Sequence, residues 1–191
     1  MKTALLSVYD KTGLVDFAKG LSSLGWRLLA SGGTSKLLQE NLVTVLEVAE
    51  YTNSPEILGG RVKTLHPAIH GGILARSSER DQKELQNFGW GYIDLVVVNL
   101  YPFEETVSRP NATYEDIIEN IDIGGVTLIR AAAKNHERVL LVSDPADYAS
   151  VLLKLSTGEP SDQMRKEFAI KGYFCTAHYD FAIGGYLSKL R

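Results

Sequence analysis

Four short and almost uninterrupted apolar runs occur along the chain, at residues 4–8, 27–30, 94–99 and 139–143. They restrict the fold more than any other feature, because a strand without a polar face has to be covered on both sides. Such runs predict buried strands of a parallel sheet, and residues 44–48 are a fifth candidate strand.

Helical patterns separate the runs. Apolar residues with i, i+3, i+4, i+7 spacing predict a helix from Leu14 to Leu24, which Gly25 ends. Further helices are predicted from a Thr34 cap to about Asn41, over 79–88, over 114–120 behind a capping box at Thr113, from Asp144, and over 161–190 with possible breaks at Gly172 and Gly184. Alternating strands and helices predict an α/β fold, with an open and mostly parallel sheet and helices on both faces.

Composition limits the class of protein. A chain of 191 residues is long enough for one well-buried domain. Its net charge of −3 gives no general attraction to nucleic acid or to an anionic membrane. Cys175 is the only cysteine, so an internal disulfide and a zinc site of several thiolates are excluded. No apolar run suits a membrane span or a signal peptide, and we therefore expect a cytoplasmic protein.

The apolar residues of segment 52–76 show neither the helical nor the strand spacing, and we expect this segment to form a loop of about 20 residues. Loops of this length in a compact domain usually carry a function. Arg61 and Lys63 alternate within this segment, and an extended chain would project both to one side. The alternative is a solvated basic loop. His66 and His70 have no acidic partner at metal-ligand spacing in the segment, so we expect no metal site.

Glycine-rich turns follow two of the predicted elements. The sequence Ser31-Gly32-Gly33-Thr34 precedes a helix, whose free N–H groups can bind a phosphate together with Lys11. The alternative is a tight turn with a threonine cap. No Gly-Lys-Ser/Thr follows, which argues against a Walker-type nucleoside triphosphatase.

A second glycine pair, at residues 124 and 125, begins another predicted helix. Asp122 precedes this helix, and its carboxylate is either a helix cap or an acid–base group. Lys134 lies at the other end, where a cation is either a stabilising cap or a reactive group.

Six segments, in this order, resemble the inosine monophosphate cyclohydrolase domain: SVYDKTG, ASGGT, GRVKTLHPAIHGGIL, VVNLYPF, IDIGGVTLIRAAAKNH and YDFAIGGY. In most organisms that domain is the N-terminal half of a bifunctional purine-biosynthesis enzyme, ahead of a transformylase. The resemblance implies a methylglyoxal-synthase-like fold, which is a Rossmann-like three-layer sandwich. It also implies a single cyclohydrolase domain over residues 1–191, with no transformylase domain in this chain.

The implied reaction closes 5-formamidoimidazole-4-carboxamide ribonucleotide (FAICAR) to inosine monophosphate (IMP) with loss of water, and it needs no metal or cofactor. The resemblance places the 5′-phosphate on Lys11, Ser31, Gly32, Gly33 and Thr34, and the base beside Arg61, Lys63 and Thr64. Its catalytic residues are Lys63, Tyr101, Asp122 and Lys134, with Gly124 and Gly125 as oxyanion donors and Asn99 and His136 as further candidates. We expect a buried Lys134–Asp122 pair to divide the acid and base roles.

One position departs from the family pattern: Tyr9 replaces a phosphate-binding serine, and we expect its backbone N–H to serve instead. The resemblance also implies a homodimer and a transformylase domain or protein as functional partner, without nucleic acid or membrane. Two alternatives remain. One is a methylglyoxal synthase acting on dihydroxyacetone phosphate with Asp10 or Asp122 as base. The other is a non-catalytic phosphate-binding module, like that of carbamoyl phosphate synthetases, which would not need Lys63, Asp122 or Lys134.

Overall fold

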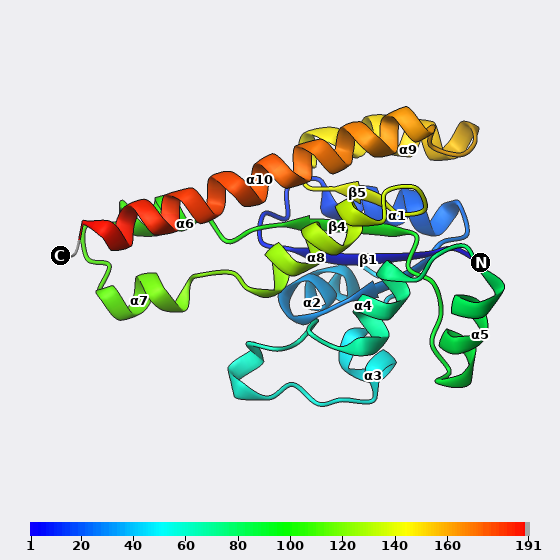
Figure 1. Cartoon of the computed structure of the whole chain (residues 1–191), viewed down its shortest axis with the longest axis horizontal. Helices are drawn as coiled ribbons and strands as arrows, with labels where there is room; N and C mark the ends of the chain where they lie inside the picture. Colours follow the sequence, from blue (N-terminus) through cyan, green and yellow to red (C-terminus); the bar gives the residue numbers. More distant parts are fainter. Residues whose placement is uncertain (190–191) are drawn as a thin grey trace.

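The computed structural model describes residues 1–189 and shows a parallel sheet between layers of helices (Figure 1). The predicted strands are confirmed, and their order in the sheet is β3-β2-β1-β4-β5. They are β1 (Thr3–Val8), β2 (Arg27–Ala30), β3 (Leu46–Glu47), β4 (Leu95–Asn99) and β5 (Leu140–Val142). Strand β3 is shorter than the predicted run because a helix begins at Val48.

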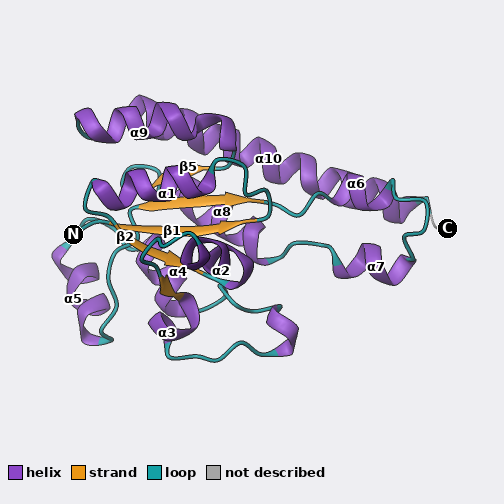
Figure 2. Cartoon of the chain, turned by 180° about the vertical axis from the view of Figure 1, so that it is seen from behind, coloured by secondary structure: helices purple, strands orange, loops and turns teal. Residues whose placement is uncertain are grey.

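Helices cover both faces of the sheet, as predicted (Figure 2). They are α1 (Leu14–Ser23), α2 (Gly32–Glu40), α3 (Val48–Thr52), α4 (Pro67–Leu74), α5 (Glu79–Asn87), α6 (Phe103–Val107), α7 (Tyr114–Glu119), α8 (Gly124–Lys134), α9 (Tyr148–Thr157) and α10 (Asp162–Ser188), with 3-10 turns η1 (Leu58–Gly60) and η2 (Pro145–Asp147). In β1, Leu6 packs in the core formed with α1 and α9, whereas Leu5 packs in the core formed with α4 and α8. Burial on both faces explains the uninterrupted apolar runs.

Two predictions about helices need correction, and a third, which left one or two C-terminal helices open, is decided by the structure. Helix α2 begins at Gly32 with Ser31 as its N-cap, so Thr34 is an internal residue and not the cap. The loop predicted over residues 52–76 contains helix α4. The segment after Ser161 forms one helix, and neither possible break occurs. A Cβ at Gly172 would lie 2.3 Å from Leu141 Cδ2, so glycine at this position allows α10 to approach β5. Residue 190, the end of that prediction, lies outside the described residues.

Helix α10 continues past the sheet and packs beside α6, which the sequence pattern did not predict (Figure 1). A small separate core joins these helices to α7 through Phe103, Ile117 and Tyr179. The capping box predicted at Thr113 is confirmed at the start of α7. This small core lies under the turn that carries Asp122, because the Tyr179 hydroxyl accepts the Asp122 N–H at 2.8 Å.

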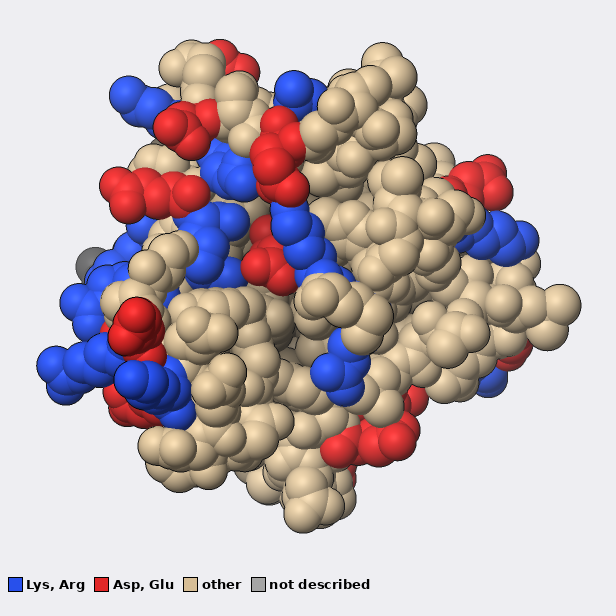
Figure 3. All heavy atoms as spheres, turned by 90° about the vertical axis from the view of Figure 1, so that its right-hand side faces the viewer, with Lys and Arg blue, Asp and Glu red and all other residues tan. Residues whose placement is uncertain are grey.

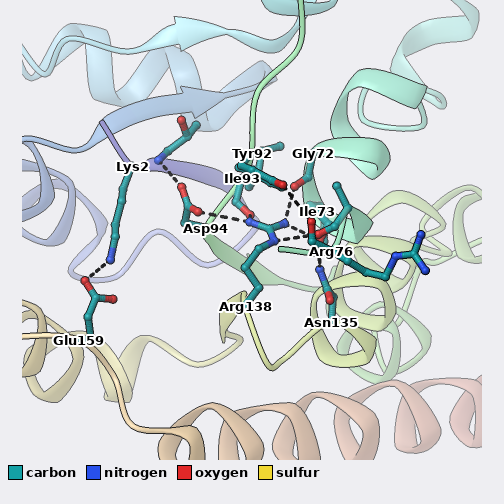
Figure 4. Close-up of polar contacts among 12 residues, drawn as sticks. Lys2, Gly72, Ile73, Arg76, Tyr92, Ile93, Asp94, Asn135, Arg138 and Glu159 are labelled. Carbon is teal, nitrogen blue, oxygen red and sulfur yellow. Dashed lines mark hydrogen bonds and ion pairs between the residues drawn. The ribbon is translucent and has the colours of Figure 1, made fainter. Parts of the chain in front are cut away.

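Two side chains from the α8–β5 loop cap the C-terminus of α4 (Figure 4). The last carbonyls of a helix have no partner inside the helix. Here the Arg138 guanidinium donates to the carbonyls of Gly72, Ile73 and Ala75 at 2.6, 2.8 and 2.9 Å, and Asn135 donates to the last two at 2.7 and 3.0 Å. This clamp fixes α4 and, with it, the segment that precedes α4 in the chain.

Candidate active site

A cleft of about 560 Å³ lies at the carboxyl ends of β1, β2 and β4. Strand β1 is the point where the chain changes from building one side of the sheet to building the other, and open α/β sheets bind ligands at such a switch point. The cleft brings together thirteen of the predicted residues: Lys11, Ser31, Gly32, Gly33, Thr34, Arg61, Lys63, Thr64, Asn99, Tyr101, Asp122, Gly124 and Gly125. Its volume falls within the range of small-molecule sites.

One corner of the cleft is suited to an anion. Ser31 is the N-cap of α2, and its hydroxyl makes no capping hydrogen bond. Gly32 has a φ of 52°, in the left-handed region that favours glycine. The Lys11 ammonium lies 3.8 Å from where a Cβ of Gly33 would stand, and within residues 1–189 the Gly33 N–H has no hydrogen-bond partner. These groups fit the predicted phosphate site.

Three polar groups predicted to meet the ligand are already used by the fold. The Thr34 hydroxyl bonds both the N–H and the carbonyl of Val8, each at 3.1 Å. The Tyr9 N–H donates to Asn99 Oδ1 at 2.7 Å, so the expectation that this N–H would bind phosphate is wrong. The Asn99 amide also bonds the Asp10 backbone. Thr34 and Asn99 therefore line the cleft while holding the end of β1.

A carboxylate that the sequence analysis did not predict binds at the start of α2. Glu47, at the end of β3, accepts the Gly32 N–H at 3.2 Å and the Ser35 hydroxyl at 2.9 Å. The helix N-terminus therefore holds one anionic group already, beside the position proposed for phosphate. No local pattern indicates this contact, because it depends on β3 pairing with β2.

Lys63 lies across two glycines. Its Nζ would be 2.8 Å from a Cβ at Gly32, and its Cε would be 2.2 Å from a Cβ at Gly60, where φ is 89°. The Lys63 ammonium pairs with Glu56 at 3.1 Å. The two glycines thus leave room for the lysine side chain, and Glu56 supplies its counter-ion.

Arg61 pairs with Glu119 across the mouth of the cleft. Both side chains are exposed. The Glu119 carboxylate raises the pKa of Arg61, and the Arg61 guanidinium lowers the pKa of Glu119. Arg61 and Lys63 are thus ion-paired residues of a cleft and do not form the solvated basic loop that was the alternative.

Asp122 caps the start of α8, as one of its two predicted roles requires, and its carboxylate also lines the cleft. Its Oδ1 accepts the Gly125 N–H at 2.6 Å, which holds the start of α8, and its Oδ2 accepts the Tyr101 N–H at 3.4 Å. Burial raises the pKa of this carboxyl above the ordinary value of 3.8. The carboxylate lines the cleft as a stronger base than an exposed aspartate. The Gly125 N–H, predicted as an oxyanion donor, is used by Asp122.

Lys134 and His136 lie away from the cleft. Lys134 is exposed at the last position of α8, about 15 Å along the helix from Gly124 at 1.5 Å per residue. The expected buried Lys134–Asp122 pair is therefore wrong. His136 is in contact with the Ala133 carbonyl at 3.0 Å, at the same distant end of the helix.

The opposite end of the sheet, seen in Figure 3, has charges of both signs side by side. Ion pairs there include Lys2–Glu159 and Arg76–Asp81. Across the described part of the chain, no three His, Cys, Asp or Glu residues are grouped so as to hold a metal ion. None of the helices within residues 1–189 is long and apolar enough to cross a membrane.

Two protein families match consecutive parts of the chain. The family described as "MGS-like domain" matches residues 13–127, and the family described as "AICARFT/IMPCHase bienzyme" matches residues 132–191. Together they extend over nearly the whole chain, with the cleft residues from Ser31 to Gly125 in the first match and α10 in the second, whereas Lys11 precedes both.

Similar proteins include two relatives described as "Bifunctional purine biosynthesis protein PurH". The relative from Desulfitobacterium hafniense is 54% identical over 188 residues, which are 98% of this chain and 36% of that protein. The relative from Bacillus cytotoxicus is 52% identical over 190 residues, which are 98% of this chain and 37% of that protein. The chain thus spans little more than a third of the length of these relatives.

A solved structure described as "Crystal structure of ForH" superimposes with a TM-score of 0.84 and 38% sequence identity, covering 96% of this chain and 97% of that one. The fold and the family match over residues 13–127 together show that the chain belongs to the MGS-like domain family.

Proposed function

We propose that this chain is an inosine monophosphate cyclohydrolase, which closes FAICAR to IMP with loss of water. The observation that carries the proposal is the arrangement of the cleft. A phosphate corner at Lys11 and Ser31 lies in the same cleft as Lys63, Tyr101 and Asp122. The names of the PurH relatives and of the bienzyme family support the same purine chemistry.

In the proposed reaction the carboxamide nitrogen attacks the formyl carbon, a C–N bond forms, and one nitrogen proton has to leave. Asp122 accepts this proton, because burial raises the pKa of its carboxyl. The formyl oxygen gains a proton and becomes a hydroxyl group. This hydroxyl then leaves as water together with the proton of the formamide nitrogen, which completes the ring.

Lys63 supplies the positive charge that the formyl oxygen needs as the bond forms. To do so its ammonium exchanges Glu56, now 3.1 Å away, for the substrate oxygen. The Tyr101 side chain, half-exposed beside Tyr9, closes the same side of the cleft and donates to the reacting amide. Gly124 and Thr64 complete the wall against which the imidazole lies, with the Thr64 hydroxyl 3.0 Å from where a Cβ of Gly124 would stand.

Much of the rate is expected to come from orientation. Both reacting groups are attached to one imidazole, so a cleft that holds the ring and the phosphate can bring them together without a second molecule. Arg61, Gly32 and Gly33 complete the binding surface in this proposal. No step requires a metal or cofactor.

The test is an assay of the conversion of FAICAR to IMP, in which the appearance of the purine absorbance is measured. Asp122→Asn is expected to lower kcat by at least about 100-fold, as removal of a general base does. Asp180→Asn is the matched control, because Asp180 is exposed on α10 and is absent from the cleft lining. Turnover of dihydroxyacetone phosphate to methylglyoxal, or IMP binding without ring closure, would contradict the proposal and favour one of the two alternatives.

We further propose that residues 1–191 act as one cyclohydrolase domain in the cytoplasm, as a homodimer, with a transformylase domain or protein supplying FAICAR. Lys134 is outside the cleft of its own chain, so a catalytic role for Lys134 requires a second copy. Sedimentation velocity tests the dimer. Mixing Lys134→Ala with Asp122→Ala protein tests the shared site: restored activity supports it, and two variants that stay inactive when mixed contradict it.

A further inference from the structure

We propose that Tyr179 of α10 is a positioning residue, whose hydroxyl holds the turn that presents Asp122 to the cleft. The inference rests on the proposed function, in which Asp122 accepts a proton. It adds a residue from a helix that contributes none of the cleft lining.

The Tyr179 hydroxyl bridges the turn between α7 and α8. It accepts the Asp122 N–H at 2.8 Å and donates to the Asn120 carbonyl at 3.4 Å. The side chain is 7% exposed, so water does not readily replace either bond. Both ends of the turn are therefore tied to one atom of α10.

The turn is otherwise supported on its α7 side, where Ile121 packs against the core of Phe103, Ile117 and Tyr179 and its N–H donates to the Ile118 carbonyl at 3.2 Å. Ile123, next to Asp122, is 56% exposed and contributes no core packing. The Asp122 carboxylate is held by the N–H groups of Gly125 and Tyr101, which fix its oxygens and make no contact with the Asp122 backbone N–H. The hydroxyl of Tyr179 fixes that backbone.

The ring of Tyr179 and its hydroxyl have separable roles. The ring packs against Phe103 with centroids 6.2 Å apart, as part of the core shared with Ile117. Tyr186, two turns further along α10, packs against the same Phe103 at 5.9 Å. Tyr186 is partly exposed, and in residues 1–189 its hydroxyl has no hydrogen-bond partner, so it serves as a control that shares the packing on Phe103 and lacks the contact to the turn.

The experiment compares Tyr179→Phe with Tyr186→Phe, because both changes remove one hydroxyl and keep the ring. We expect Tyr179→Phe to lower kcat for FAICAR closure about tenfold or more, with KM within about twofold, since small displacements of a reacting group reduce the rate strongly. The Asp122 amide proton is expected to exchange with D2O about tenfold faster, because it has lost its acceptor. Tyr186→Phe is expected to change neither quantity.

Two results would overturn the inference: an unchanged kcat in Tyr179→Phe, or equal losses in both variants, which would indicate a general effect on the core. If the unmodified protein forms no IMP, the proposed function fails. The positioning of Asp122 by Tyr179 is then decided by hydrogen exchange alone. Equal exchange rates for the Asp122 amide in the unmodified protein and in Tyr179→Phe would refute that positioning.

Discussion

Replacing Gly125 by alanine separates helix stability from catalysis. Gly125 is the second residue of α8 and does not have a positive φ, so alanine is compatible with its backbone. At an ordinary helix position this change stabilises a protein by about 1 kcal/mol. Here the new Cβ would lie 2.6 Å from Asp122 Oδ2 and 2.7 Å from Leu100 Cδ2.

Both contacts are too short, so Asp122 or α8 has to move. The Asp122 carboxylate cannot turn away freely, because its other oxygen accepts the Gly125 N–H at 2.6 Å. Losing a hydrogen bond to a charged group costs about 1.5–3 kcal/mol, which exceeds the gain in helix propensity. We therefore expect Gly125→Ala to be about 1 kcal/mol less stable, with a Tm lower by about 2–4 °C. We expect kcat to fall about 100-fold, because the carboxylate is displaced from the substrate.

The assay combines thermal unfolding with FAICAR closure, and Gly184→Ala is the control. Gly184 lies within α10, and a Cβ there would meet no atom within 4 Å. The control should gain about 2–4 °C in Tm and keep its kcat, since only helix propensity changes. A Gly125→Ala protein with raised Tm and unchanged kcat would refute the reasoning.

Three further predictions concern charge. Burial raises the pKa of Asp122 in the folded state above 3.8, so the native state loses stability as pH rises from 3.8 toward the folded pKa. Asp122→Asn should therefore unfold at a higher temperature than the unmodified protein at pH 7, and this gain should disappear below pH 3.8. Equal melting curves of the two proteins at both pH values would contradict this prediction. Arg138→Ala removes the charged donor from three carbonyls at the end of α4, which keep only Asn135 and the Ile93 N–H as donors, so the free energy of unfolding in urea should fall by about 1.5–3 kcal/mol, and an unchanged urea midpoint would argue against the clamp. Glu119→Gln releases Arg61 from an exposed ion pair worth about 1 kcal/mol or less, so KM for FAICAR should fall by up to about fivefold at constant kcat, and a raised KM would show that Glu119 supports binding.

The sheet was predictable because each of its strands carries its own signal. Leu5 and Leu6 belong to opposite cores, and only a sheet covered on both sides buries two neighbouring residues of one strand in this way. Helix α4 was missed for the opposite reason. It contains Gly71 and Gly72, which lower helix propensity, and it is stabilised by tertiary contacts such as the Arg138 clamp at its C-terminus.

The cleft residues were predicted from strand ends and from the family resemblance, while their counter-ions were not. Glu119 is 58 positions from Arg61, and no local pattern connects them. The predicted Lys134–Asp122 pair is wrong within one chain because the prediction treated a continuous motif as a single site. Residues 124–134 form one helix, and its two ends are too far apart to meet the same substrate group.

The ion pairs of Arg61 and Lys63 affect how quickly an anionic ligand associates. Because Glu119 and Glu56 already balance these cations, the mouth of the cleft exerts little long-range attraction, and the association rate constant should depend weakly on ionic strength. Each tethered carboxylate also competes with the ligand at an effective concentration of about millimolar or higher. A ligand that contacts the cleft at several points can displace Glu119 and Glu56 from their cations. Small inorganic anions below that effective concentration cannot, so the two carboxylates make the cleft selective for the larger ligand.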